Sequence, residues 1–311
     1  MEYQLSETAP PGWESFCRRT NAVFGSPGWQ QVVETSFGAS TLYAWNGESG
    51  GAITVFRAGP FSVGYVGFPA GSIAFERDLP AGIVAQVRKN RLLNKVTCIR
   101  IPVSGFADDQ DLGFQYASNP ETAITNLQRW DLMGVSKNLR RDLRKAGKSD
   151  VIVRQTNETS FGPLIYGIYE STVRHHGGSL RYNRDYFSAL LELAAQTPAV
   201  QFFVAELSGE VIGFAVVVHH GDAAFYLHGG AIPGARKLSP SDLILAQAIA
   251  KAKSSGRRLF NFMASPRDQP TLVRYKEKWG AETREIRTYT VPVSGAYPFF
   301  KLAEYLRRSV S

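Results

Sequence analysis

The fold is decided by residues 201–229, which read QFFVAELSGEVIGFAVVVHHGDAAFYLHG. Three segments rich in β-branched and aromatic residues, 201–207, 211–219 and 223–229, are separated by short turn signals at Ser208-Gly209-Glu210 and Gly221-Asp222. Such runs, bounded by short turns that contain glycine, are typical of hairpin strands. The stretch therefore predicts a three-stranded antiparallel meander.

The residues after the meander predict two helices alternating with two strands. A helix over 243–253 would begin at Ser239, Ser241 or Asp242 and end before Gly256, since these residue types favour helix N-caps and C-termini. The other predicted elements are a short buried strand over 259–263, a helix with a basic face over 271–279 and a last strand around 284–291.

The first half of the chain repeats this order of elements. Segments 41–45, 52–57 and 62–68 predict a second meander, followed by a helix-compatible stretch over 81–90 and a strand over 96–101. Gly67 then corresponds to Gly229, Pro80 to Pro240 and Cys98 to Phe260, an offset of 160 to 162 residues. Identity between the halves is low, so chance similarity is the alternative. We predict an α+β protein of two tandem domains, 1–125 and 126–311, with the boundary in the polar stretch 117–128.

Composition and charge limit the function classes. Of 311 residues 44% are hydrophobic and 20% charged, which excludes a disordered or collagen-like chain. The net charge of +8 is concentrated: residues 137–148 hold six basic side chains and one acidic, and residues 251–287 hold ten and four. We expect an anionic partner at these places. A helix over 136–148 would put positions 137, 141, 144 and 148 on one face, which is either a solvated surface or an anion-binding one.

Several features are expected to be absent. Cys17 and Cys98 lie far apart without metal-ligand spacing, so we expect two small buried residues and neither a disulfide nor a zinc site. No carboxylate neighbours His175-His176 at ligand spacing, so no metal is expected there. The first residues resemble no signal peptide and no apolar run is long enough to span a bilayer, which favours a cytoplasmic location.

Three stretches resemble the GNAT acyltransferases, and in particular their two-domain Fem-type branch: SKNLRRDLRKA (136–146), LHGGAIPGARKLSPSDLILAQAI (227–249) and YKEKWGAE (275–282). This branch includes peptidoglycan-bridge aminoacyltransferases, which use aminoacyl-tRNA, and proteins identified as acetyltransferases. The resemblance implies tandem GNAT-like domains, each a mainly antiparallel mixed sheet flanked by helices, the first degenerate and the second an acyltransferase domain.

The activity that the resemblance implies is N-acyl transfer. An acetyl or aminoacyl group would pass from acyl-CoA or aminoacyl-tRNA, bound as a co-substrate and not as a tightly held cofactor, to a small amine or a cell-envelope precursor of cell-wall synthesis. Both donors are activated, and no Gly-x-Ser-x-Gly elbow is present, so direct attack of the amine in a ternary complex is expected. The alternatives are a catalytically silent anion- or nucleic-acid-binding module and a scaffold whose basic face docks on anionic lipid.

The donor loop departs from the family pattern. The typical GNAT loop is a Gln/Arg-x-x-Gly-x-Gly/Ala run that cradles the pyrophosphate of coenzyme A. This chain has Arg236, Lys237, Ser239 and Ser241 at that place and no glycine beyond Gly234. Charged side chains and helix amides could still hold a phosphate, although both serines could simply be helix caps. The loss of the glycines weakens the case for acetyl-CoA.

Two residues are candidates for catalysis. Lys276, in YKEKWGAE, matches the lysine that in tRNA-dependent relatives is thought to stabilise the tetrahedral intermediate or the terminal phosphate of the donor. His228, at the end of the central strand, could accept a proton near neutral pH, or it could be a satisfied core residue.

Further residues are candidates for substrate binding. Arg181 and Tyr182 follow the histidine pair in a segment that lies near the acceptor in the relatives, and Arg140, Arg141 and Arg144 belong to the basic helix. In the first half, Phe68-Pro69-Ala70-Gly71 stands where the second half has His228-Gly229-Gly230, so we expect the first domain to be non-catalytic. Trp13, Trp29 and Trp45 there are expected in the core.

Overall fold

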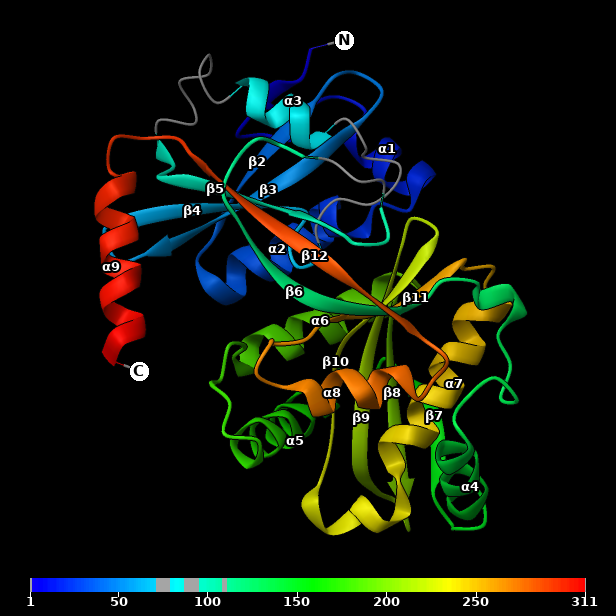
Figure 1. Ribbon diagram of the computed structural model, residues 1–311. Helices are drawn as coiled ribbons and strands as arrows, with labels where there is room; N and C mark the ends of the chain where they lie inside the picture. Colours follow the sequence, from blue (N-terminus) through cyan, green and yellow to red (C-terminus); the bar gives the residue numbers. More distant parts are fainter. Residues whose placement is uncertain (1, 71–78, 87–94, 108–110, 311) are drawn as a thin grey trace. The chain divides into compact units, whose positions relative to one another are not determined.

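The computed structural model describes residues 2–70, 79–86, 95–107 and 111–310, with the side chains of 307–310 left out (Figure 1). The chain divides into two compact units, Met1–Asn119 with Glu285–Ser311 (unit 1) and Pro120–Arg284 (unit 2). The division near residue 120 lies just before the boundary at 125/126 that the sequence suggested. Residues 285–311, which we had assigned to the second domain, belong to unit 1.

Unit 1 contains a sheet in the order β1-β2-β3-β4-β5-β12. Its strands are β1 (Gln4–Ser6), β2 (Ser40–Trp45), β3 (Gly50–Ala58), β4 (Phe61–Val66), β5 (Cys98–Val103) and β12 (Glu282–Pro292), and its helices are α1 (Trp13–Thr20), α2 (Pro27–Phe37), α3 (Leu79–Gln86) and α9 (Tyr297–Val310). Trp13 and Trp29 are fully buried and Trp45 packs beside Trp13, which confirms their expected place in the core. Both cysteines are buried and free, as expected.

Unit 2 contains a sheet in the order β6-β11-β10-β9-β8-β7. Its strands are β6 (Tyr116–Ile124), β7 (Ile152–Thr156), β8 (Val200–Leu207), β9 (Glu210–His220), β10 (Ala223–Ala231) and β11 (Leu259–Ala264), and its helices are α4 (Lys137–Ala146), α5 (Gly162–His175), α6 (Arg184–Gln196), α7 (Pro240–Ser254) and α8 (Pro270–Glu277). Strands β6 and β12 cross the division: β6 begins in unit 1, and β12 begins in unit 2.

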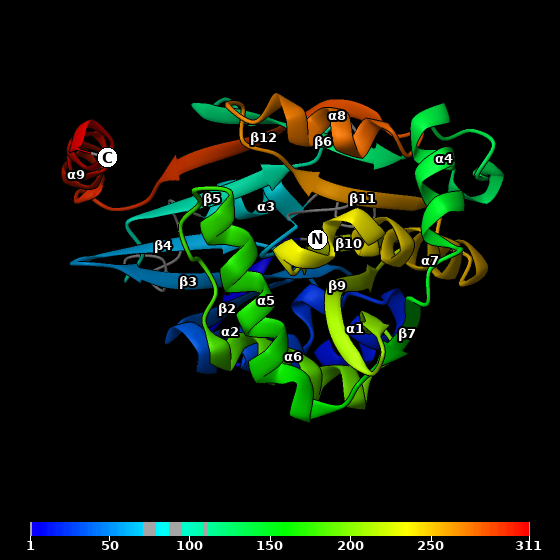
Figure 2. The ribbon, with the colours of Figure 1, turned by 90° about the horizontal axis from the view of Figure 1, so that it is seen from below.

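Strand β9, inside the sheet of unit 2, is buried on both faces because helices cover each side of the sheet (Figure 2). Successive residues of a strand point to opposite faces. Ala215 and Val217 of β9 belong to the core cluster that includes Ile244 and Leu245 of α7. Phe214, on the other face, contacts Phe187 of α6 with ring centroids 6.0 Å apart. This explains why residues 211–220 read as a continuous apolar run rather than an alternating one.

The predicted meanders and the repeat are confirmed. Strands β8, β9 and β10 pair antiparallel in sequence order, as do β2, β3 and β4. In each half the third strand then pairs in parallel with a strand that follows a helix, β4 with β5 and β10 with β11. Val63 lies opposite Cys98, and Ala223 lies opposite Leu259, so the registers repeat with an offset of 160 to 161 residues.

One expectation about a loop differs from the structure, and one about a helix end lies partly outside the described residues. The stretch 117–128 was expected to be a loop, but most of it lies in β6, which pairs with β11 from Phe260 to Ala264. The dipeptide Asn119-Pro120 favours a turn locally, and the pairing with a distant strand overrides that preference. The helix expected over 81–90 is described as α3 to Gln86, and the rest of that range lies outside the described residues. Within the described part of the chain, we find no helix with the length and hydropathy needed to cross a membrane.

Candidate functional site

Strands β10 and β11 of unit 2 run together for only part of their length. Their parallel register covers Ala223–Phe225 of β10 and Leu259–Asn261 of β11. Immediately afterwards β10 has an irregularity between Tyr226 and His228, while it stays paired with β9 as far as Ala231. The backbone of residues 226–231 on one strand and 262–264 on the other is therefore outside the ladder between these two strands.

The Lys276 amine lies at the end of β11, beyond the part of this strand that pairs with β10. Lys276 is on α8 and only 4% exposed. Its Nζ donates to the Met263 carbonyl at 2.8 Å and to Ser265 Oγ at 2.8 Å, and lies 3.5 Å from the Ala264 carbonyl. An ammonium has three donors, so one N–H has only the long contact. Burial lowers the pKa of Lys276 to about 8, against a smaller raising effect of Glu121.

A buried polar chain stands behind these acceptors. Glu121 Oε1 of β6 accepts from Asn261 Nδ2 at 2.7 Å, and Asn261 Oδ1 accepts from the Met263 backbone N–H at 2.7 Å. Met263 has φ +63°, a conformation that non-glycine residues rarely adopt. The Ser265 N–H donates to the Pro120 carbonyl at 2.8 Å. The carbonyl and hydroxyl that hold Lys276 are thus fixed by β6. Sequence reasoning missed Glu121 and Asn261, because nothing local pairs residues 140 positions apart.

His228 is enclosed by aromatic rings. Its ring centroid lies 4.4 Å from that of Tyr182, 5.3 Å from Phe187 and 5.4 Å from Tyr186, and its Nε2 is 3.1 Å from Tyr186 Oη. Burial lowers the pKa of His228 to about 3. The imidazole is therefore neutral at pH 7 and a poor proton acceptor, so this geometry supports a packing and hydrogen-bonding role better than the general-base role that the sequence suggested.

The acceptor-segment candidates lie beside that histidine. Tyr182 packs edge-on against His228 and burial raises its pKa to about 12. Arg181 is exposed, and its backbone N–H donates to Tyr169 Oη at 3.2 Å. The structure thus brings Tyr182 and His228 together. Tyr169, Tyr186 and Phe187 complete the cluster, and the sequence pattern alone did not single them out.

Backbone and side-chain groups of α7 itself take up the hydrogen-bonding positions at the start of this helix. Ser239 is the N-cap with φ +50°, and its carbonyl accepts from the backbone N–H of both Asp242 and Leu243 at 3.1 Å. Pro240, the first helical residue, has no N–H. The Asp242 side chain lies in the first turn and accepts from Tyr275 Oη at 2.8 Å, and burial raises the pKa of this carboxyl. A carboxylate already stands where the helix dipole would attract a phosphate.

Before α7, the donor-loop arginine contacts the histidine pair. Arg236 Nη1 lies 2.7 Å from His175 Nε2 at the end of α5. Burial, followed by the nearby Arg236 and His175, lowers the pKa of His176. Lys237 is exposed. The loop is therefore cationic even though it has no amide cradle.

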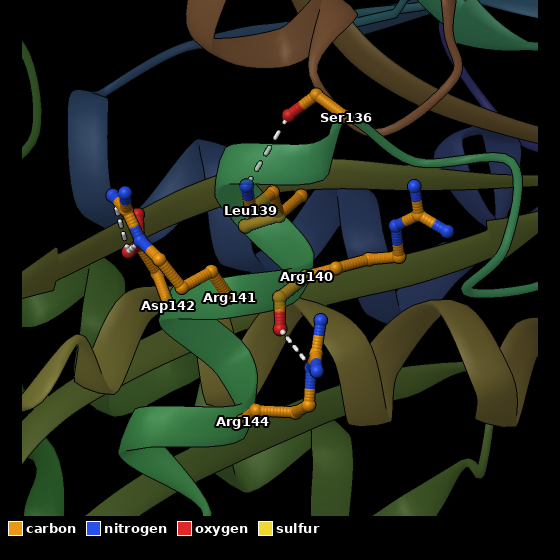
Figure 3. Close-up of polar contacts among 6 residues, drawn as sticks. All are labelled: Ser136, Leu139, Arg140, Arg141, Asp142 and Arg144. Atoms are coloured by element: carbon orange, nitrogen blue, oxygen red, sulfur yellow. Dashed lines mark hydrogen bonds and ion pairs between the residues drawn. The ribbon is translucent and has the colours of Figure 1, made fainter.

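The basic helix α4 is exposed on most of its surface. Ser136 is its N-cap and accepts from the Leu139 N–H, and Arg141 pairs with Asp142 at 3.2 Å (Figure 3). Arg144 bends toward the Arg140 carbonyl, so these two guanidinium groups lie on one side of the helix and Arg141 on the other (Figure 3). The helix ends at Ala146, so Lys148, expected on its basic face, lies in the following turn.

Helix α4 also lies close to the start of α7. The carboxylate of Asp142 is among the charges that raise the pKa of Asp242, and Lys278 acts in the opposite sense. Arg141 and Arg144 of α4 and Lys237 of the loop before α7 are exposed cations of unit 2. Among the described residues, no group of three or more His, Cys, Asp and Glu side chains could hold a metal.

Comparisons with known proteins agree with this architecture. Residues 134–277 match the model of the acetyltransferase (GNAT) domain. The FemX structure matches with a TM-score of 0.65 at 12% identity, over 91% of this chain and 96% of that chain. No curated protein matches the chain in sequence.

Two further structures match over both units. A C-terminal domain ascribed to a lysylphosphatidylglycerol synthetase of Agrobacterium fabrum has a TM-score of 0.59 at 15% identity, covering 94% of each chain. The L-PGS structure from Bacillus licheniformis has a TM-score of 0.59 at 12% identity, over 91% of this chain and 92% of that one. At these identities the likeness establishes a shared fold over nearly the whole chain.

Proposed function

Because residues 134–277 of this chain are a GNAT acetyltransferase domain, we propose that the protein is an N-acyltransferase that transfers an aminoacyl group from aminoacyl-tRNA to an amine. Transfer of an acetyl group from acetyl-CoA is the second candidate, and the family model's description favours it. The observation that carries the first choice is the start of α7. Pro240 has no N–H, the Asp242 and Leu243 N–H groups both donate to the Ser239 carbonyl, and the Asp242 carboxylate lies in the first turn, so few donors remain there for a pyrophosphate.

The reaction needs no covalent enzyme intermediate. The lone pair of the acceptor amine forms a bond to the acyl carbon, and the carbonyl electrons move onto oxygen. Collapse of this oxyanion breaks the C–O bond to the 3′ ribose of the tRNA, and the ribose oxygen leaves with the proton that the amine has lost. With acetyl-CoA the broken bond would be C–S and the thiol would leave.

Lys276 is the group suited to the oxyanion. Its ammonium is held by neutral oxygens and retains an N–H with only a 3.5 Å contact. A fixed donor in a site without water stabilises the oxyanion more than the ground-state carbonyl, because charge develops only in the transition state. The donor carbonyl would enter where β10 and β11 diverge. The choice of Lys276 over His228 for this role is supported by their pKa values of about 8 and about 3, because at pH 7 the lysine is charged and the histidine is neutral.

The exposed cations of α4 and of the loop before α7 suit the phosphates of a nucleic acid. Arg141 and Arg144 of α4 and Lys237 before α7 are exposed. Exposed cations give affinity that falls steeply with salt, because binding releases counterions from the phosphates. Arg181 and Tyr182 are proposed to contact the acceptor, whose class by the resemblance is a small amine or a cell-envelope precursor.

A donor comparison tests the proposal. The intact chain is titrated with a stable amide-linked aminoacyl-tRNA, with uncharged tRNA and with acetyl-CoA, and the rise in thermal unfolding temperature is measured, since a ligand of the folded state stabilises it. We expect the charged tRNA to shift the transition at micromolar concentration and acetyl-CoA to leave it unchanged at millimolar concentration. Neutralising Arg141 and Arg144 should weaken tRNA binding and reduce the slope of log K against log salt by about one for each phosphate that is no longer neutralised.

The outcomes separate the candidates. A shift with acetyl-CoA alone overturns the tRNA proposal in favour of acetyl transfer. Equal binding of charged and uncharged tRNA without turnover of any acyl donor supports the binding-module alternative. Neutralising Arg18 and Arg19 of unit 1 provides the matched control, because it removes the same charge from another exposed helix.

A further inference from the structure

The buried carboxylate of Glu121 lies in the strand beside the Lys276 cradle. Glu121 is 2% exposed, and a carboxylate at such a position is costly unless a fixed partner compensates it. It has no motif around it in the sequence, and the proposed acyl transfer does not call for it. Its contacts within unit 2 lead to the Lys276 amine.

Three hydrogen bonds connect the two groups. Glu121 Oε1 accepts from Asn261 Nδ2 at 2.7 Å, Asn261 Oδ1 accepts from the Met263 N–H at 2.7 Å, and the Met263 carbonyl accepts from Lys276 Nζ at 2.8 Å. The first two bonds hold the Met263 backbone in place, and the charge of Glu121 acts on the Lys276 amine through space. The Met263 N–H that donates to Asn261 Oδ1 belongs to the residue whose φ is +63°.

A second path fixes the other acceptor. The Ser265 N–H donates to the carbonyl of Pro120, the residue before Glu121, and Ser265 Oγ accepts from Lys276 at 2.8 Å. Ser265 is 1% exposed and Asn261 1%. The strand that carries Glu121 therefore sets both short contacts of the amine.

We propose that Glu121 is a positioning residue for Lys276: its buried carboxylate holds the Met263 backbone through Asn261 and, by its charge, keeps the lysine amine in its charged, hydrogen-bond-donating form. The claim about the charge of Lys276 stands on the cluster itself. The claim that this charge supports turnover rests on the proposed function.

The electrostatics agree in sign. Burial lowers the pKa of Lys276, and Glu121 is the charged group that acts on this pKa in the opposite direction. Glu277, the adjacent carboxylate of α8, is exposed and accepts from Thr283 Oγ1 at 2.8 Å. With the pKa of Lys276 at about 8, the ammonium predominates at pH 7. A lower pKa would leave a smaller fraction of the amine protonated at pH 7.

The test replaces the charge and keeps the shape. Glu121→Gln retains an oxygen to accept from Asn261 and has the same size. In protein labelled with ¹³C at lysine Cε, the Lys276 signal is assigned by its loss in Lys276→Met, and its titration is followed by NMR. We expect the midpoint to fall by about one pH unit, the lower end of the effect of a nearby opposite charge. Glu277→Gln is the matched control and should leave the midpoint unchanged.

Turnover provides the second measurement. With a midpoint one pH unit lower, kcat/KM of Glu121→Gln should stay within about twofold of the wild type at pH 6 and fall about eightfold below it at pH 8.5. Loss of packing alone would lower turnover equally at both pH values. Ser265→Ala, which removes one acceptor of the ammonium, should also lower the NMR midpoint and provides a second variant if Glu121→Gln does not fold.

An unchanged Lys276 midpoint in folded Glu121→Gln overturns the proposal, and so does an unchanged midpoint in Ser265→Ala if Glu121→Gln does not fold. If Lys276→Met keeps full turnover, the proposed role of Lys276 fails, yet the NMR titration still decides whether Glu121 controls its charge. The two failures are therefore distinguishable.

Discussion

Strands β5 and β11 occupy equivalent places in the two units, and a cation is held beside each of them in a different way. Cys98 faces Val63 as Leu259 faces Ala223, so Arg100 of β5 corresponds to Asn261 of β11. Arg100 donates to Tyr65 Oη at 2.6 Å and pairs with the carboxylate of Glu304 on α9.

The difference lies in what faces the positive charge. In unit 1 a carboxylate contacts the cation directly, so the charge is neutralised in place. In unit 2 neutral oxygens hold Lys276, and the carboxylate of Glu121 acts from behind Asn261. Among the described residues, no ion pair forms at Lys276. In the described part of the chain, Lys276 is thus held without a carboxylate in contact, whereas Arg100 is paired with one.

The largest expected effect comes from removing the Lys276 cation. Lys276→Met should lower kcat by about 10²- to 10³-fold, the usual loss when one oxyanion donor is removed, with turnover measured on the donor identified by binding. Because Met fills the same volume without a buried charge, the variant should remain folded by circular dichroism. Full turnover in this variant would remove the distinction between the two cations.

The contribution of Lys276 to the unfolding free energy of the protein should depend on pH. The pKa of Lys276 falls from 10.5 in the unfolded chain to about 8 in the fold, so the unfolded state binds more protons between these values and stability rises with pH. Relative to Lys276→Met, the wild type should gain about 3 kcal/mol of unfolding free energy from pH 8 to 10.5. Urea unfolding at both pH values measures it, and a constant difference would contradict the assignment.

Breaking the ion pair of unit 1 should affect stability and leave chemistry alone. Arg100→Leu leaves Glu304 and Tyr65 without their cation, which should cost about 2 kcal/mol of unfolding free energy. Turnover of the folded variant should equal that of the wild type. A loss of turnover without a loss of stability would show that the degenerate repeat takes part in the reaction.

The smallest effect concerns His228. Its pKa of about 3 lies below the ordinary value of 6.5, so it stabilises the fold above pH 6.5 and that contribution is lost as the pH falls. His228→Phe should therefore lose about 2 kcal/mol less than the wild type when the pH is lowered from 6.5 to 5. Urea unfolding at the two pH values checks this, and kcat should show no inflection near 6.5 that the substitution removes.

Local patterns were enough for the strands and helices that form the repeat. The runs 201–207, 211–219 and 223–229 combine high β-propensity with short turns, so each specifies its own conformation and its neighbour's register. Strand β6 was not predicted, since Asn119-Pro120 favours a turn and only pairing with β11 makes it extended. The helix over 136–148 was predicted correctly except at its end, where Gly147 stops it.

By itself, the sequence determined the duplicated α+β architecture and the cationic segments, because periodicity, turn chemistry and charge are local properties, and the family resemblance singled out Lys276. Only the tertiary structure decided what those residues can do. Burial made His228 a neutral member of an aromatic cluster, and the Asp242 carboxylate lies at the start of α7. Pairing of β6 with β11 placed Glu121 beside Asn261, 140 residues away in the sequence and next to the residues that hold the Lys276 amine. Solvation and charge at a site depend on every element packed around it, so a linear pattern does not specify them.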